Sequence, residues 1–236
     1  MKKTFIQALF LFIPVFFLGQ SDFVVKESSV VTDSKTNFSE NSIWCSDLIS
    51  HRDSLGFAHE KSMQLEEHAL QRALYFIGVI DNTTQDKKMH EAVSNIPKTR
   101  KSHDRRFGYP EYFKESRYDY VPNYPAFRVS GSWISVSGEV MQECCYFFKS
   151  GSKLSQDEII KKMLEHHKNR RGSGHIMSRY LGSESHTRII EKPGNVYYGS
   201  SVSYIIHTWY SEKDELWCND VLMMNVTVFG ELEGIK

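Results

Sequence analysis

Three polar side chains stand in local settings that could present them to a ligand. His103 follows Ser102, Glu139 follows Gly138, and His175 follows Ser173-Gly174. Flanking glycines allow a close backbone approach and leave a polar side chain accessible at a turn. Imidazole suits Zn²⁺, and carboxylates can complete its ligand shell. The same residues could instead form a hydrogen-bonded cluster in which the carboxylate stabilises a partly charged histidine.

The sequence contains none of the common catalytic signatures. It has no H-E-x-x-H, no G-x-S-x-G, no Walker A loop and no G-x-G-x-x-G. No serine or cysteine has a recognisable base partner in sequence, so binding is favoured over catalysis. His59 and His68 lie nine residues apart, do not share a helical face and are expected at the surface. His166 and His167 are also expected at the surface, near the end of a helix.

Helical periodicity dominates the first half of the chain. In the segment 62–80, Leu65, Ala69 and Ala73 recur at four-residue steps, which places Glu66, Glu67 and Arg72 on the solvent side. Ser155 and Glu158 form a capping box ahead of an apolar run, so another helix begins there. The helices expected from these patterns cover residues 43–55, 62–80, 86–94, from 155 onward, and 175–181.

The last third of the chain changes to strand patterns. Residues 197–209 and 216–229 are rich in Val, Ile, Tyr, Trp and Thr, and the polar segment 211–215 between them predicts a turn. The segment 97–131 contains four prolines and is expected to be a long irregular loop. Helices followed by a hairpin favour an α/β layered domain with an antiparallel sheet.

Composition restricts the class of protein. The 236 residues include 40% hydrophobic and 13% aromatic side chains, enough for one substantial core. Lys and Arg total 29, as do Asp and Glu. The resulting net charge of zero argues against a nucleic-acid binder, which normally carries a basic surplus.

The N-terminus has the layout of a secretory signal peptide. Lys2 and Lys3 precede an apolar run over 8–18, and small or polar residues follow at 19–21. The alternative, a membrane anchor, is disfavoured because the run is shorter than the roughly 20 residues needed to cross a bilayer. We therefore expect a signal peptide over 1–20, an exposed arm over 21–41, a domain over 42–236, and a secreted or periplasmic protein without a transmembrane segment in the mature chain.

Four cysteines are compatible with export. Cys144 and Cys145 are adjacent and should point in different directions in regular structure, so a bond between them would be strained. Export favours at least one disulfide, with Cys45 to Cys218 or Cys45 to Cys144 as the favoured pairings. Four buried thiols remain the alternative.

The order of these features resembles the CAP superfamily, the cysteine-rich secretory, antigen 5 and pathogenesis-related 1 proteins. The resemblance runs from Leu48-x-x-x-Arg52-x-x-Leu55-Gly56 through the periodic second helix. It continues through Ser102-His103, Gly138-Glu139, the helix from 155, Ser173-Gly174-His175 and the closing strands. The resemblance covers roughly residues 42–230, and over this range the chain is similar to a divergent, bacterial-type member of the family.

The resemblance implies a three-layer α/β/α sandwich with a central antiparallel sheet and a cleft framed by His103, Glu139 and His175. Glu165 is the candidate for the second carboxylate of the cleft, with Glu143 a weaker match. Val140 stands where the family has Asn, and the helix from 155 lacks the family's Trp. The resemblance implies extracellular binding of a lipid, peptide, glycan or divalent metal such as Zn²⁺, held by His103 and His175. A metal-assisted hydrolase using the same cleft, or a structural extracellular protein, is the alternative.

The signal peptide yields a direct prediction. Exported material should begin at Gln20 or Ser21, because the basic and apolar segments before it are removed on secretion. N-terminal sequencing of protein recovered from outside the cytoplasm checks this, and material that begins at Met1 would contradict it.

Overall fold

The computed structural model describes residues 27–32, 40–83, 89, 126–129, 132–169 and 176–232. His103 and His175 lie outside these ranges, as does most of the helix expected over 86–94. The helices are α1 (Glu40–Ser54), α2 (Met63–Thr83), α4 (Gln156–Asn169), α5 (Ile176–Leu181) and α6 (Glu184–Ile190). The strands are β1 (Glu27–Thr32), β2 (Glu60–Lys61), β3 (Ala126–Val129), β4 (Ser132–Ser150), β5 (Tyr197–Ser211) and β6 (Leu216–Leu232).

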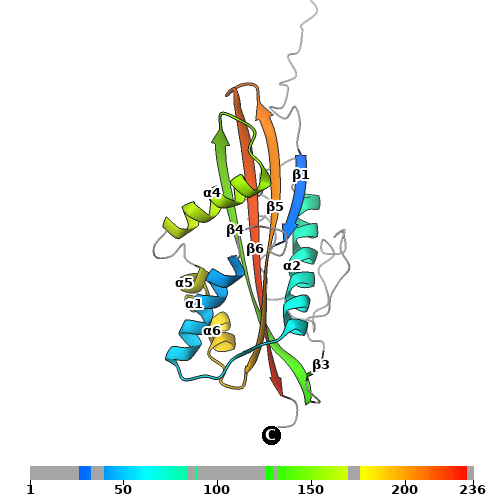
Figure 1. The fold of residues 1–236 in the computed structure, drawn as a ribbon, viewed down its shortest axis with the longest axis vertical. Helices are drawn as coiled ribbons and strands as arrows, with labels where there is room; N and C mark the ends of the chain where they lie inside the picture. The colour runs from blue at the N-terminus through cyan, green and yellow to red at the C-terminus, as the bar shows by residue number, and fades with distance from the viewer. Residues whose placement is uncertain are drawn as a thin grey trace, which may run out of the picture.

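One sheet organises the described chain, and its main path is antiparallel in the order β1-β5-β6-β4-β3. The two-residue β2 adds a parallel pairing to β5. Three long strands, β4, β5 and β6, run side by side along the length of the molecule (Figure 1). The mixed α/β class, the antiparallel sheet and the β5–β6 hairpin predicted from the sequence are confirmed.

β4 was not expected from the sequence. Its residues from 135 to 146 are buried or half-buried on both sides, so hydrophobic and polar residues do not alternate strictly along it. A register shift between Val136 and Gly138 interrupts its pairing with β6. Because a bulge inserts one extra residue, Val136 and Glu139 both face the same side of the sheet. The alternation of side chains expected for one strand is therefore interrupted at the bulge, although the strand itself continues through it.

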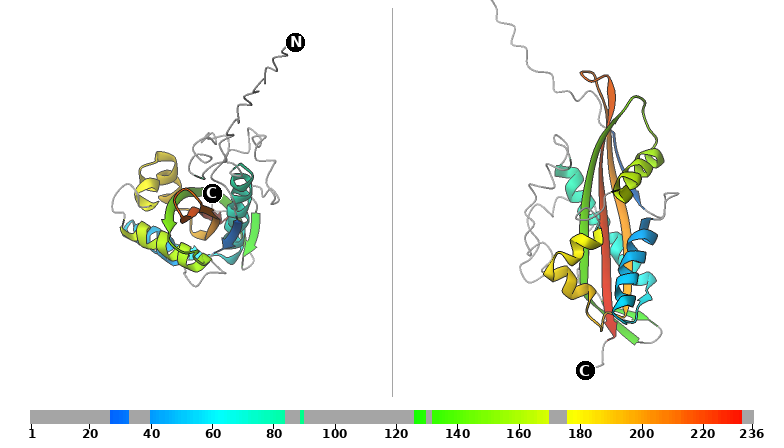
Figure 2. Two further views of the ribbon diagram at one scale, coloured as in Figure 1. Left: turned by 90° about the horizontal axis from the view of Figure 1, so that it is seen from above. Right: turned by 90° about the vertical axis from the view of Figure 1, so that its left-hand side faces the viewer.

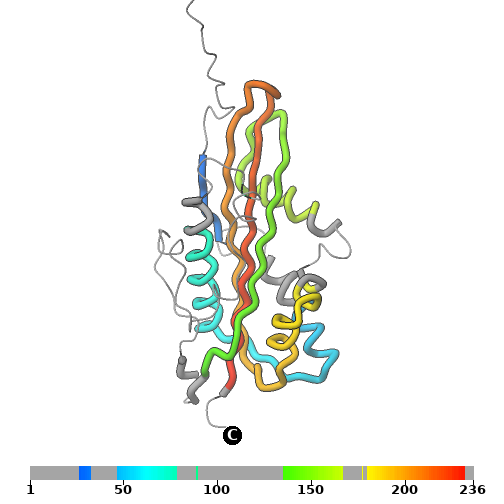
Figure 3. Tube along the Cα trace, turned by 180° about the vertical axis from the view of Figure 1, so that it is seen from behind, coloured from blue at the N-terminus to red at the C-terminus, as the bar shows by residue number. Residues whose placement is uncertain are grey.

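Helices cover both faces of the sheet, as two views show (Figures 2 and 3). One face carries an apolar cluster joining Val140, Val221 and Met223 to side chains of α1, α4, α5 and α6. The other carries a second cluster, in which Leu222 and Val226 pack against α2. We call this second side the α2 face. The two clusters together bury both sides of β5 and β6.

The helix starts follow their sequence signals. The Ser155 backbone N–H donates to Glu158 Oε2 at 2.8 Å, and the Glu158 N–H donates to Ser155 Oγ at 3.3 Å, which confirms the capping box. The short β1 lies within the segment expected to be an N-terminal arm and pairs with residues 203–208 of β5. α6 was not expected as a helix separate from α5. None of the described helices is long and apolar enough to cross a membrane.

Gly199 sets how closely α2 can approach the sheet. A Cβ at this position would lie 2.1 Å from both the Glu66 nitrogen and the Leu65 carbonyl carbon. Since these are backbone atoms of a helix, they cannot move aside as a side-chain tip could. The absence of a side chain at Gly199 therefore lets α2 lie directly on β5.

We predict that Gly199→Ala lowers the free energy of unfolding by about 3 kcal/mol or more, because overpacking here must displace α2. Gly151→Ala is the matched control, since a Cβ there meets no atom within 4 Å. Urea denaturation of both variants measures the difference. Equal stabilities would show that α2 is not held at this distance.

Candidate functional site

The structure describes two of the four predicted cleft residues. Glu139 lies on β4 and points to the α2 face, where its side chain is 6% exposed. Glu165 is exposed on α4, a helix whose apolar side packs on the opposite face of the sheet. The structure therefore does not bring Glu139 and Glu165 together.

Glu139 forms a bidentate ion pair with Arg72 of α2. Arg72 Nε donates to Glu139 Oε2 at 2.9 Å, and Arg72 Nη2 donates to Glu139 Oε1 at 2.6 Å. The Arg72 side chain is fully buried, and its guanidinium lies 4.8 Å from the centre of the Phe76 ring. Such fork-like pairing is both directional and strong, because two charge-assisted hydrogen bonds form at once.

Arg72 was expected on the solvent side of its helix, and this expectation is wrong. Arg72 follows Leu65 by seven residues and Ala69 by three, so it lies on the stripe that packs against the sheet. Sequence reasoning assigned it to solvent because a lone arginine is rarely buried. The spacing of Arg72 from Leu65 and Ala69 is the signal that could have predicted its burial, together with an acidic partner, Glu139, on β4.

The backbone geometry accounts for the contact between α2 and β4. Gly199, Val228 and Glu139 form one row across β5, β6 and β4. α2 lies close to the sheet at Gly199, two turns before Arg72. Arg72 can therefore reach Glu139 at the β4 end of the row, and the bulge at Val136/Gly138 turns Glu139 toward it.

His68 completes this buried polar cluster, which we define as His68, Arg72 and Glu139. It was expected at the surface but is only 4% exposed. Burial first, and the positive charge of Arg72 second, lower the pKa of His68 from 6.5 to about 4, while Glu139 partly opposes the change. His68 is therefore neutral at neutral pH. His166, by contrast, is exposed as predicted.

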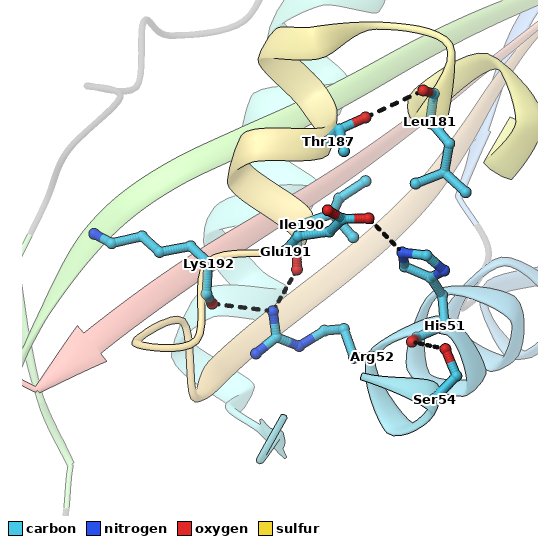
Figure 4. Close-up of polar contacts among 8 residues, drawn as sticks. All are labelled: His51, Arg52, Ser54, Leu181, Thr187, Ile190, Glu191 and Lys192. Carbon is cyan, nitrogen blue, oxygen red and sulfur yellow. Dashed lines mark hydrogen bonds and ion pairs between the residues drawn. The ribbon is translucent and has the colours of Figure 1, made fainter. Parts of the chain in front are cut away.

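A second buried arginine has a different role. Arg52 of α1 is fully buried, and burial lowers its pKa. Its guanidinium donates to four backbone carbonyls, two of which are drawn in Figure 4. The distances to the oxygens of Ile190, Asn195, Ala58 and Lys192 are 2.5, 2.9, 3.1 and 3.3 Å. Arg52 thus fixes the end of α1 to the loop that leads into β5.

A hydrogen bond between His51 of α1 and Glu191 lies beside Arg52. His51 Nε2 lies 3.0 Å from Glu191 Oε1, and both side chains are partly exposed (Figure 4). The hydrogen bonds of the Arg52 guanidinium described above all go to backbone carbonyls, and the guanidinium also lies 5.5 and 5.8 Å from the ring centres of Phe57 and Phe229. We therefore assign Arg52 and its neighbours a structural role.

The cysteines occupy different parts of the sheet. Cys144 and Cys145 face opposite sides, as predicted, because Cys144 joins the first apolar cluster and Cys145 packs against that of the α2 face. The structure has Cys144, Cys145 and Cys218 as thiols. Cys218 pairs with Lys149, five positions from Cys144 along β4, or roughly 17 Å away, which is too far for a disulfide. The side chain of Cys45 lies outside the described part, so its pairing stays a prediction.

The described residues contain no group of three or more His, Cys, Asp or Glu side chains placed to hold a metal ion. Both oxygens of Glu139 accept hydrogen bonds from Arg72, so Glu139 is poorly suited to be a metal ligand in this arrangement. The cluster can instead fix the relative position of α2 and β4. Comparisons with protein-family models, with curated proteins and with solved structures find no match for this chain.

The depressed pKa of His68 makes stability depend on pH. The unfolded chain takes up a proton near pH 6.5, whereas folded His68 does so only near pH 4. The contribution is therefore complete above pH 6.5 and is lost as the pH falls toward 4. At pH 4.5 the loss is about 2 to 3 kcal/mol.

His68→Gln should remove this part of the pH dependence, since glutamine does not titrate. Urea denaturation at pH 7.0 and pH 4.5 measures it, with His166→Gln as the exposed control. A decline in His68→Gln as steep as in the wild type would contradict the assignment.

Proposed function

We propose that this chain is an exported binding protein of the CAP type, with a three-layer α/β/α sandwich and a ligand site that includes Glu139. In support, the described elements follow the order that the resemblance implies: two helices, the Gly138-Glu139 strand, the helix from 156, the helix after His175, and the closing hairpin. Helices also lie on both faces of the sheet.

The observation that carries the proposal is the buried cluster of His68, Arg72 and Glu139. Removing an ion pair from water costs much of what its attraction gains, and apolar residues of similar size often stabilise a core as well or better. Apolar side chains such as Leu65, Phe76 and Val228 pack on the same face. A charged pair at this position is therefore better explained by a need to orient groups near Glu139 than by stability alone.

In this proposal Glu139 is a positioning residue, while His103 and His175 bind the ligand. Two imidazoles suit Zn²⁺, with water or the ligand itself filling the other positions. α5, which begins directly after His175, packs beside β4 on the face opposite α2. The proposal therefore requires His175 and Glu139 to approach each other around the outer edge of β4. Lipids, peptides and glycans remain ligand classes for the same cleft.

Zn²⁺ uptake tests the proposal on the full mature chain. Equilibrium dialysis with Zn²⁺ alone at pH 7.5, followed by metal analysis, should give one ion per chain. Uptake should fall as the pH drops through about 6, because protonated imidazole cannot bind metal. His103→Ala with His175→Ala should abolish uptake, whereas the exposed control His166→Ala should retain it.

Unchanged uptake in the double variant, or none in the wild type, would overturn the assignment of these histidines and favour a structural protein. Hydrolysis of an ester or peptide library that depends on Zn²⁺ and is lost in the double variant would instead favour a metal-assisted hydrolase.

A further inference from the structure

Met63 presents its sulfur to solvent at the start of α2. It is the first residue of that helix and is 81% exposed. The next most exposed of the large hydrophobic side chains that the structure describes, Leu55, is 41% exposed. Because so little of the Met63 side chain is covered, both lone pairs of its sulfur are accessible to small solutes.

The other methionines of the domain are shielded by the two apolar clusters. Met141 packs against the cluster of the α2 face and is partly buried. The remaining ones are between 0% and 7% exposed: Met89, Met163, Met177, Met223 and Met224. Met1 belongs to the segment expected to be removed on export. Among the methionines that the structure describes, Met63 alone is freely exposed.

The start of α2 is held by residues on either side of Met63. Ser62 is 4% exposed, and its Oγ accepts a hydrogen bond of 3.4 Å from the Leu65 backbone N–H. Leu65 is fully buried and joins the cluster of the α2 face. An oxygen atom added to the Met63 sulfur would therefore lie in water, whereas one added to Met223 would place an unpaired polar group in the core.

We propose that Met63 is a site of reversible oxidation by peroxides. A lone pair of Met63 Sδ bonds to one oxygen of hydrogen peroxide while the O–O bond breaks, and the other oxygen leaves as water. The sulfur is oxidised by two electrons to the sulfoxide, and the peroxide is reduced by two. Methionine sulfoxide reductases, with a dithiol as the reductant, return the sulfoxide to the thioether and release its oxygen as water.

Exposure also determines the stereochemistry of the product. Attack through one lone pair or the other gives two sulfoxide epimers, and each epimer is reduced by a different class of reductase. Because both lone pairs of Met63 are accessible, the two epimers should form in roughly equal amounts. Full repair of this site therefore needs both epimer-specific reductases.

Peroxide oxidation of the full mature chain tests the proposal. The chain is treated with excess hydrogen peroxide at pH 7 in the presence of a chelator, and sulfoxide at each methionine is followed by mass spectrometry of proteolytic peptides. Met63 should react within about twofold of the rate of N-acetylmethionine amide, and about tenfold or more faster than Met163 or Met224. In the urea-unfolded chain the rates should converge, because burial no longer distinguishes the sulfurs.

Matched variants identify the reactive sulfur. Met63→Leu should lack the fast phase of oxidation, whereas Met141→Leu, which replaces a partly buried methionine, should retain it. The chain oxidised only at Met63 should keep the urea midpoint and the circular dichroism spectrum of the unmodified chain. Either epimer-specific reductase alone should remove about half of the sulfoxide, and the two together should remove all of it.

Oxidation of Met63 no faster than that of Met163, or a fast phase that persists in Met63→Leu, would overturn the assignment. A lower urea midpoint after oxidation of Met63, or sulfoxide that both reductases leave in place, would overturn reversible oxidation in the folded chain. The chemistry needs no metal and none of the cleft residues, so these outcomes are independent of the Zn²⁺ test of the proposed binding function.

Discussion

The arrangement of α2 on the sheet depends on one buried ion pair, Arg72 with Glu139. Its two hydrogen bonds tie a helix to an edge of the long central strands, across a row that begins at Gly199. Loss of either partner would leave an uncompensated charge in an apolar layer, at a cost of about 3 to 5 kcal/mol. Three other features fit this ion pair: the bulge turns Glu139 toward α2, Gly199 lets α2 lie close to the sheet, and His68 adds no second positive charge beside Arg72.

The sequence predicted those elements whose signals are local. The capping box at Ser155, the periodicity of α2 and the turn between β5 and β6 all depend on residues within one or two turns of each other, and all are confirmed. β4 escaped prediction because burial on both faces removes the alternation that marks a strand, and its bulge shifts what remains. A bulge places two residues of one strand opposite one residue of its partner, so it cannot be recognised before the partner strand is known.

The candidate site was harder to predict for a related reason. Glu139 was selected because of its glycine neighbour, yet its ion-pair partner lies 67 residues away on a helix face assigned to solvent. His207 and Asp220 are a second case, since only the register of β5 with β6 makes these two residues neighbours. Polar residues that meet only through sheet pairing leave no trace in local spacing. Local patterns in one sequence carry no pairing information of this kind.

The pairing of β1 with β5 has a consequence for how the chain is made. Val30 of β1 pairs with Ile205, and Arg52 of α1 donates a hydrogen bond to the Ile190 carbonyl. Both early segments therefore contact partners that are synthesised much later. Contacts this distant close large loops and form slowly. The N-terminal segments therefore complete their structure only after β5 and the loop before it have been synthesised. Local signals shape α1 early, but its place in the fold is decided more than a hundred residues later.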